Sequence, residues 1–275
     1  MGKKMQVNSR PSLLRGPFVS FQSILKNRNL LSLMVRRDLK TTYGGYFLGY
    51  AWTLLEPIFF TLVFFVIFVI LRGNPDELLP LNIMLGILIY SAFSKTVSKG
   101  STQLIRNAGL IHQVSFPREL LIANVSGFQL VRLILSLVIV PIYMIYMGIA
   151  FTMSFFLLPL AVFGIILLAH GISQILCIAV VFVRDTSMVV DIGLRALFFL
   201  SGVFYSAAHI PGRYLDYHLM NPIAAYIEIC RGAVLGDLSY VTPFVILRTI
   251  GVTFAILLIG SSVFNRYQNR AVIHL

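Results

Sequence analysis

Two lysines interrupt an otherwise apolar stretch of the chain. Lys95 and Lys99 are four residues apart in the segment 83–105, so a helix there would present both on one face. A lysine at bilayer depth costs about 2.5–3.5 kcal/mol on insertion scales, so it usually faces protein or water and marks a pathway. One interpretation is that the pair attracts a pyrophosphate group. The alternative is that both side chains snorkel to the inner headgroups and anchor the topology.

Other charged residues in apolar segments need partners. Asp191 and Arg195 are one helical turn apart, which predicts an ion pair within one helix and favours a structural role over substrate contact. Glu56 precedes Pro57 early in an apolar run, and we expect a hydrogen bond between Glu56 and another helix and a kink at the proline.

Catalytic and metal sites are not indicated. The sequence shows no arrangement of nucleophile, base and orienting group, so we expect no catalytic residue. His209 and His218 lack the spacing of metal ligands, so we expect no metal site and no cofactor bound to this chain.

Composition indicates a membrane protein. Of the 275 residues 58% are hydrophobic and 12% are charged, with a mean hydropathy of +0.87, whereas soluble domains average about 45–50% apolar and about 25% charged residues. The net charge of +12 does not indicate a nucleic-acid partner, because nine of the 22 basic residues precede the first apolar run. These nine are Lys3, Lys4, Arg10, Arg15, Lys26, Arg28, Arg36, Arg37 and Lys40.

Runs of about 20 apolar residues predict an all-α polytopic membrane protein with six transmembrane helices. The predicted spans are 48–71, 83–105, 122–149, 155–183, 187–207 and 243–264. Basic residues favour one side of these spans by 14 to 3. By the positive-inside rule we expect both termini in the cytoplasm.

Segments outside the spans divide the chain further. We expect a cytoplasmic segment at 1–47, a transmembrane domain at 48–264 and a cytoplasmic tail at 265–275. A short amphipathic pattern at 106–118 ends near a helix-stopping proline and has the character of a surface element that docks into a partner. The external region 207–242 is too apolar for an ordinary loop, which predicts two half-helices dipping into the bilayer.

Several short motifs, in this order and spacing, resemble one family over most of the chain from Leu30 to Arg270. They are Arg37-Asp38-Leu39-Lys40, Leu48-Gly49-Tyr50-Ala51-Trp52, Leu55-Glu56-Pro57, Phe116-Pro117-Arg118-Glu119-Leu120, Phe182-Val183-Arg184-Asp185, and Asn221-Pro222 followed by Glu228 and Arg231. The sequence is similar to the permease subunits of ABC-2-type exporters that move polysaccharides: capsule, O-antigen and teichoic acid exporters. The resemblance implies an amphipathic interface helix before Leu48, a coupling helix at 106–118 and external gate helices at 208–235.

A coupling helix would contact the ATPase of such an exporter. Its expected anchors and neighbours are Leu110, Ile111, Val114, Phe116, Pro117, Arg118 and Glu119. Arg184 and Asp185 lie in a tight turn, where a solvated charge pair and an ATPase contact remain equally open.

The energy source must lie outside this chain, because the sequence contains no G-x-x-x-x-G-K-[ST] phosphate loop. We therefore expect ATP and Mg²⁺ on a separate ATPase in two copies. Six spans enclose too little room for a sugar-wide channel, so we expect a homodimer.

The resemblance implies export of a lipid-linked polysaccharide, of the undecaprenyl-pyrophosphate type, across the bacterial inner membrane. The alternative within the family is an exporter of a drug or a small lipid, which would need a narrower and more apolar cavity. A membrane glycosyltransferase is disfavoured, since the ten carboxylates include no cluster of Asp residues for a metal.

Aromatic side chains are candidates for the wall of a sugar channel, because sugars stack their apolar faces on rings. Phe59, Phe60, Tyr143 and Tyr146 lie in predicted spans and are the candidates for substrate contact. The alternative for each ring is packing inside the protein or contact with lipid.

Overall fold

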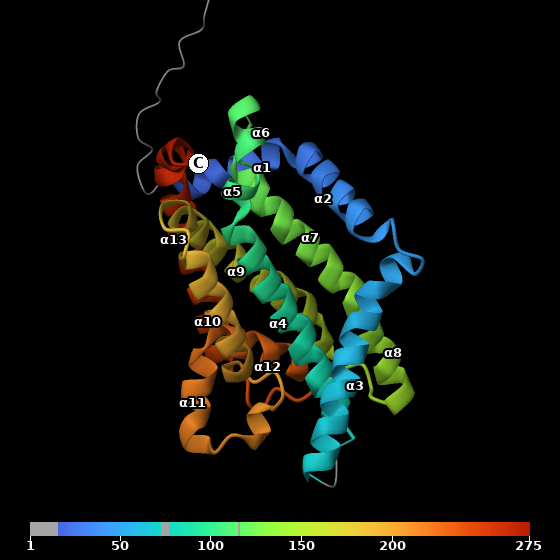
Figure 1. Ribbon diagram of the computed structural model, residues 1–275. Helices are drawn as coiled ribbons and strands as arrows, with labels where there is room; N and C mark the ends of the chain where they lie inside the picture. The colour runs from blue at the N-terminus through green and yellow to red at the C-terminus, as the bar shows by residue number, and fades with distance from the viewer. Residues whose placement is uncertain (1–15, 73–76, 115) are drawn as a thin grey trace, which may run out of the picture.

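The computed structural model describes residues 16–72, 77–114 and 116–275, and this part of the chain is built of helices without strands. The long helices run side by side (Figure 1). Helices α1, α2, α5 and α6 gather with the C-terminus at one end, called the terminal end below, and α11 lies at the opposite end (Figure 1). The predicted all-α class is confirmed.

The helices follow the apolar runs closely. Their bounds are α1 Gly16–Lys26, α2 Arg28–Tyr43, α3 Trp52–Arg72, α4 Leu79–Ser101, α5 Gln103–Arg106, α6 Ala108–Gln113, α7 Glu119–Leu137, α8 Ile139–Met147, α9 Leu157–Phe182, α10 Thr186–Leu200, α11 Gly212–Met220, α12 Pro222–Leu235 and α13 Pro243–Ile273. Single 3-10 turns occur at Gly49–Ala51, Met153–Phe156 and Ala207–His209.

Five helical segments of the described chain are long and apolar enough to cross a membrane. They are Gly49–Ile70, Leu79–Ser101, Glu119–Met147, Met153–Phe182 and Pro243–Ile273. The predicted span 187–207 forms instead the 15-residue helix α10, which rises only about 22 Å. Helix α10 ends at Leu200, and Gly202 then adopts a positive φ of 70° that turns the chain. The count of six spans stays a prediction.

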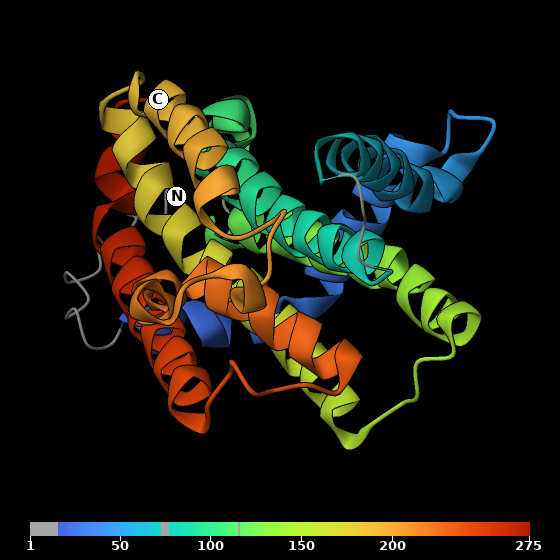
Figure 2. The ribbon, with the colours of Figure 1, turned by 90° about the horizontal axis from the view of Figure 1, so that it is seen from below.

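Helices α4 and α9 form the centre of the bundle. In their most apolar windows 72% and 67% of the residues are buried, against 17% for the span that contains α3 and 28% for α13. Figure 2, seen from below, shows α3 at one side of the bundle, away from α9 and α13. The outer helices therefore present their apolar side chains to lipid or to another protein.

Helix α12 is buried inside the protein. Twelve consecutive residues, 223–234, are buried against α9, α4 and α13. Asn221 caps the helix by accepting a hydrogen bond from the backbone N–H of Ile223 at 3.0 Å, and Pro222 starts it. Gly236, at φ 77°, ends it. The region predicted as two half-helices thus contains α11 and α12, and α12 is covered by protein.

The burial of α12 brings a charged pair into the interior. Arg231 is 2% exposed and Glu228 is 4% exposed, and Arg231 Nη1 donates to Glu228 Oε1 at 2.6 Å. The guanidinium also donates to three backbone carbonyls, those of Asn82 (2.8 Å), Val203 (2.9 Å) and Tyr205 (2.8 Å). Arg231 therefore joins α12 to the start of α4 and to the turn that follows α10.

Helices α9 and α13 approach each other through two glycines. A Cβ atom added to Gly260 would lie 2.3 Å from the backbone oxygen of Gly171, closer than atoms can approach. The two backbones therefore touch here, as small residues permit in membrane helices.

This contact predicts a large difference between two glycines of α13. Replacing Gly260 by alanine is expected to lower stability by roughly 1–3 kcal/mol, because the clash is with backbone that cannot rotate away. Replacing Gly251, whose added Cβ meets nothing within 4 Å, is expected to change stability by less than about 0.5 kcal/mol. Thermal unfolding of both variants in detergent checks this, and equal melting temperatures would contradict it.

The two ends of the described chain pack together. Helix α13 continues to Ile273, beyond the predicted end of its span at 264, and α1 lies against it. The side chain of Asn265 donates a hydrogen bond to the backbone oxygen of Gly16 at 2.9 Å and another to Ser20 Oγ. The predicted interface helix corresponds to two helices, α1 and α2, of which α2 packs against α7. Residues 1–15 of the predicted 1–47 segment lie outside the described residues.

Candidate functional site

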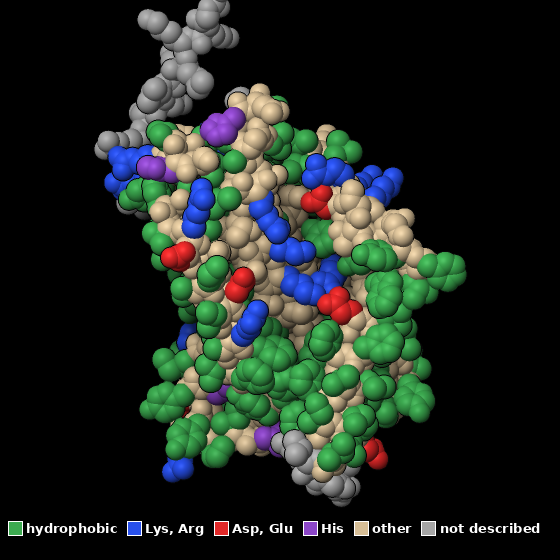
Figure 3. Space-filling model, in the orientation of Figure 1, with side chains coloured by type: hydrophobic (Ala, Val, Ile, Leu, Met, Phe, Trp, Pro, Cys, Tyr) green, Lys and Arg blue, Asp and Glu red, His purple; other side chains and the backbone are tan. Residues whose placement is uncertain are grey.

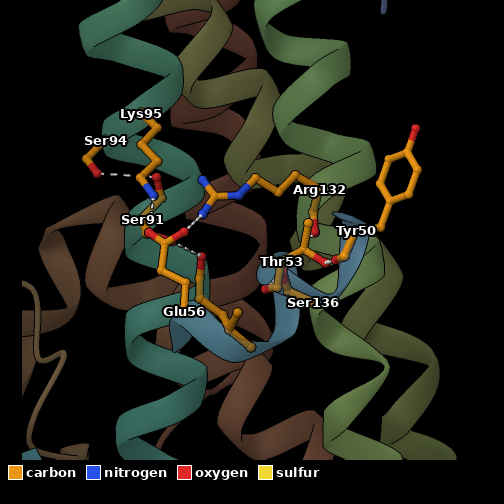
Figure 4. Close-up of polar contacts among 9 residues, drawn as sticks. Tyr50, Thr53, Glu56, Ser91, Ser94, Lys95, Arg132 and Ser136 are labelled. Atoms are coloured by element: carbon orange, nitrogen blue, oxygen red, sulfur yellow. Dashed lines mark hydrogen bonds and ion pairs between the residues drawn. The ribbon is translucent and has the colours of Figure 1, made fainter. Parts of the chain in front are cut away.

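A carboxylate from α3 joins two basic side chains from other helices. Glu56 Oε1 accepts a hydrogen bond from Lys95 Nζ of α4 at 2.7 Å, and its Oε2 accepts one from Arg132 Nη2 of α7 (Figure 4). The expectation that Glu56 needs a partner on another helix is confirmed. We call Glu56, Lys95, Lys99 and Arg132 the ion cluster.

Short polar contacts fix the start of α3 beside α7. Ser136 Oγ donates to the backbone oxygen of Thr53 at 2.8 Å, and Thr53 Oγ1 donates to that of Tyr50 at 2.7 Å (Figure 4). These contacts lie one turn before Glu56 on α3 and one turn after Arg132 on α7. The contact between Ser136 and Thr53 therefore joins the start of α3 to α7 next to the ion pair.

The ion cluster borders a cavity of about 820 Å³ between α3, α4, α7 and α10. Four basic side chains line it, Lys95, Lys99, Arg132 and Arg195, against two carboxylates, Glu56 and Asp191. Figure 3 shows basic side chains gathered in a hollow of this face, with hydrophobic side chains covering the face below them. The cavity therefore carries an excess of positive charge.

The wall of the cavity changes character along its length. The cations of α4 lie in the half of that helix nearer the terminal end, because α4 ends there at Ser101. Farther from that end the wall consists mainly of apolar side chains, among them the rings of Phe60, Phe64, Phe198 and Phe199. A ligand with an anionic head and a body that stacks on rings would match the two parts of this wall.

A second cavity of about 450 Å³ touches the same ion cluster from the side of α2. It is lined by Thr42, Tyr43, Tyr46, Trp52 and Phe128 together with Glu56, Lys95, Lys99 and Arg132. Burial raises the pKa of the Tyr43 hydroxyl, so this tyrosine stays neutral near neutral pH. Tyrosine and tryptophan are typical of the headgroup region of a membrane. All four members of the ion cluster border both cavities.

Several donors of the site lack an acceptor within the protein. Gln129 is 1% exposed, yet its Nε2 has no hydrogen-bond partner, and the same holds for Nε of Arg132 one turn later on α7. Lys99 forms no ion pair among the described residues and lies with its Nζ 5.7 Å from the centre of the Phe128 ring. Unpartnered buried donors are costly. The two nitrogens are shielded from the cavities, whereas the exposed Lys99 can bind an anion.

The structure brings some of the predicted site residues together and not others. Lys95, Lys99 and Phe60 line the main cavity. The Phe59 side chain is 56% exposed and lines neither described cavity. Tyr143 packs against the hydrophobic core and Tyr146 is 81% exposed, so neither ring faces these two cavities.

The predicted ion pair within α10 is wrong. Asp191 accepts a hydrogen bond from Ser98 Oγ of α4 at 2.7 Å, and it forms no ion pair with Arg195 among the described residues. The reason is that α4 offers a closer polar partner across the cavity. Asp191 therefore joins α10 to α4, and Arg195 is left facing the cavity.

The roles of Arg132 and Gln129 were not predicted from the sequence. Arg132 interrupts the apolar run 122–149, and the same argument that singled out Lys95 applied to it. Its partner Glu56 lies 76 positions away, a separation that no local spacing reveals. Gln129 carries no sequence signal beyond its position one turn before Arg132.

The predicted coupling segment 106–118 starts at the last residue of α5 and contains α6, and both helices lie at the terminal end (Figure 1). Residue 115 lies outside the described residues. Leu110 and Val114 are exposed, at 43% and 51%, whereas Ile111 is buried in a small core of this chain. Phe116 is half-buried against the same core. Leu110 and Val114 are therefore the apolar side chains of this segment that a partner can reach.

The residues after this segment are bound inside the chain. Arg118 Nη1 donates to Asn269 Oδ1 of α13 at 2.8 Å, and burial lowers the pKa of its guanidinium. Glu119 is buried and accepts a hydrogen bond from Gln268 at 3.2 Å. Pro117 is half-buried. These bonds join the segment to α13.

The turn between α9 and α10 lies at the terminal end as well. Arg184 and Asp185 are exposed there, without an ion pair among the described residues. No group of three or more His, Cys, Asp or Glu side chains within the described ranges is arranged to hold a metal ion.

Comparison with protein families gives a match over residues 29–235 to the ABC-2 type transporter family. The chain belongs to this family. The matched region contains the ion cluster, both cavities and the buried helix α12. Members of the ABC-2 family are transport subunits, which are not themselves catalytic.

Several curated proteins are similar to this ABC-2 chain over most of its length. The O-antigen export system permease protein RfbA of Klebsiella pneumoniae is 22% identical over 88% of this chain and 93% of its own. The polysialic acid transport protein KpsM of Escherichia coli is 28% identical over 72% of this chain and 78% of its own. The capsule polysaccharide export inner-membrane protein CtrC of Neisseria meningitidis is 24% identical over 90% of this chain and 94% of its own.

Proposed function

We propose that this ABC-2 permease exports a lipid-linked polysaccharide of the undecaprenyl-pyrophosphate type across the bacterial inner membrane. The observation that carries the proposal is the main cavity, in which an excess of basic side chains is followed by an apolar wall that includes four Phe rings. Cations suit a pyrophosphate and rings suit the apolar faces of sugars. The similar O-antigen, polysialic acid and capsule export proteins support the same substrate class.

The second cavity suits an inner-leaflet opening for the lipid. It lies beside Tyr46 and Trp52 and leads to the ion cluster that also borders the main cavity. A carrier lipid in the membrane would bring its pyrophosphate to Lys95, Lys99 and Arg132 from this side. The glycan would then follow the rings of the main cavity.

Energy for this transport would come from a separate ATPase that docks on the terminal end, which we place in the cytoplasm. Exposed Leu110 and Val114 of the coupling segment offer apolar anchors at helical spacing, and Arg184 and Asp185 lie at the same end. The ATPase would carry ATP and Mg²⁺ in two copies, one for each permease of a homodimer. The half-open main cavity would then be closed by the second permease.

The rival proposal within the family is export of a drug or a small lipid. Such a cargo requires mainly apolar contacts, whereas this cavity has four basic side chains in its wall. The observed charge therefore favours the polyanionic carrier.

Reconstitution with the partner ATPase tests the proposal. The purified chain alone is expected to hydrolyse no ATP, because it lacks a phosphate loop. The complex in liposomes is expected to hydrolyse ATP faster when a polyprenyl-pyrophosphate-linked glycan is present, and to move that glycan across the bilayer. Stimulation by a hydrophobic drug, with none by the glycan, would instead support the rival proposal.

A further inference from the structure

Glu56 binds cations of the ion cluster as an anionic ligand would. Its two carboxylate oxygens bind different cations on different helices, Oε1 with Lys95 and Oε2 with Arg132 (Figure 4). Glu56, Lys95 and Arg132 line both cavities. The carboxylate therefore stands at the junction between the two cavities, where a phosphate group passing from one to the other would bind.

The cluster offers more positive charge than one carboxylate can use. Two cations bind Glu56, and a third, Lys99, borders the same cavities without an ion pair within the described residues. A carboxylate supplies two oxygens and one negative charge, whereas a diphosphate supplies more of both. The unused positive charge corresponds to the part of a diphosphate that a carboxylate cannot replace.

The carboxylate is placed where it can leave. The side chain of Glu56 is 40% exposed, more than those of Lys95 (33%) and Arg132 (13%). It belongs to α3, whose span is the least buried of the five. A partly exposed ion pair contributes little stability, so a stronger anion can separate it.

We infer that Glu56 is an internal competitor for the diphosphate site, and that a lipid-borne diphosphate must displace it from Lys95 and Arg132 to enter the main cavity. This inference rests on the proposed function. Because the competitor is tethered in place, its effective concentration is high and weak anions lose to it. Glu56 is thus a specificity-determining residue, which rejects singly charged phospholipid headgroups and yields to a diphosphate.

Binding to the full-length chain in nanodiscs of neutral lipid tests the inference, with inorganic pyrophosphate and farnesyl diphosphate as probes. The ATPase is left out because its nucleotide sites would bind pyrophosphate. If Glu56 holds the cations about nine-tenths of the time, Glu56→Gln should tighten binding of either probe about tenfold. Farnesyl diphosphate should bind more tightly than pyrophosphate if the ligand arrives from the membrane, and equal affinities would favour a free anion.

The matched control is Glu77→Gln, which removes the same charge at an exposed position outside both cavities. It should leave both affinities unchanged, and adding Lys95→Gln to Glu56→Gln should abolish the gain. Glu56→Asp keeps the charge on a shorter arm and should give an intermediate gain, which provides a second variant should Glu56→Gln fold poorly. Wild-type affinity in Glu56→Gln, or an equal gain in Glu77→Gln, would overturn the inference.

The two proposals fail separately. If glycan export is observed while Glu56→Gln binds the probes as the wild type does, the inference is wrong and the proposed function stands. If Glu56→Gln binds diphosphate about tenfold more tightly but the complex moves no glycan, the inference about Glu56 stands and the proposed substrate is wrong.

Discussion

Replacing Arg231 by methionine is expected to destabilise the chain by roughly 3–5 kcal/mol, the usual cost of leaving a buried charge without its partner. The variant leaves Glu228, 4% exposed, without its counter-ion, and removes donors from the carbonyls of Asn82, Val203 and Tyr205. Unfolding of the purified chain in detergent measures the loss. Arg213→Met, on the exposed face of α11, is the matched control and should be nearly silent.

A double variant separates charge from packing. Methionine at both Glu228 and Arg231 removes the whole pair, and should recover part of the stability lost by Arg231→Met because no bare charge remains. The carbonyls that Arg231 bound stay without donors, so recovery should be incomplete. A single variant as stable as the wild type would show that the interior tolerates a lone Glu228, and would refute the assigned role of Arg231.

Replacing both Lys95 and Lys99 by glutamine is expected to reduce glycan export at least about tenfold, the effect of losing roughly 1.4 kcal/mol of substrate binding. Arginine at both positions should largely preserve export, because charge matters more than shape for a phosphate. Export and glycan-stimulated ATP hydrolysis, measured at matched expression, check the prediction. The control is glutamine at Lys26 and Lys40, two exposed lysines of α1 and α2, which gives the same change in net charge.

The snorkelling interpretation makes the opposite prediction for this pair. If the lysines only reach for headgroups, glutamine and arginine variants should export alike. The ion pair between Lys95 and Glu56 already disfavours this for Lys95, because its ammonium is bound between helices. Equal export by the double glutamine and the double arginine variants would remove Lys95 and Lys99 from the proposed path of the glycan.

The class of fold and most helices were predictable because apolar runs of about 20 residues have few alternatives to a membrane helix. Family membership followed from short motifs in order. The end of α10 was not predictable from hydropathy, because Val203, Phe204 and Ala207 extend the apolar run and only the turn at Gly202 reveals the break. Apolar content also could not distinguish α12, buried in protein, from a helix that dips into lipid.

The site was predictable residue by residue but not as an arrangement. Lys95 stood out because a lysine in an apolar run is costly, and the need of Glu56 for a partner followed from the same argument. Which cation it would find depends on how α3, α4 and α7 pack. Of the four rings chosen as candidates, Phe60 lines the cavity while the exposed Tyr146 does not, because a helix places residues on every side and composition does not say which side is inward.

The packing of α1 against α13 has a consequence for biosynthesis. Gly16 and Asn265 are in contact across 249 positions of the chain. As a ribosome delivers the protein from its N-terminus, α1 is made early and must wait on the membrane surface until the last helix has been inserted. A chain that is truncated before α13 would leave the polar groups of α1 without partners, and such unfinished products would be ready targets for membrane proteases.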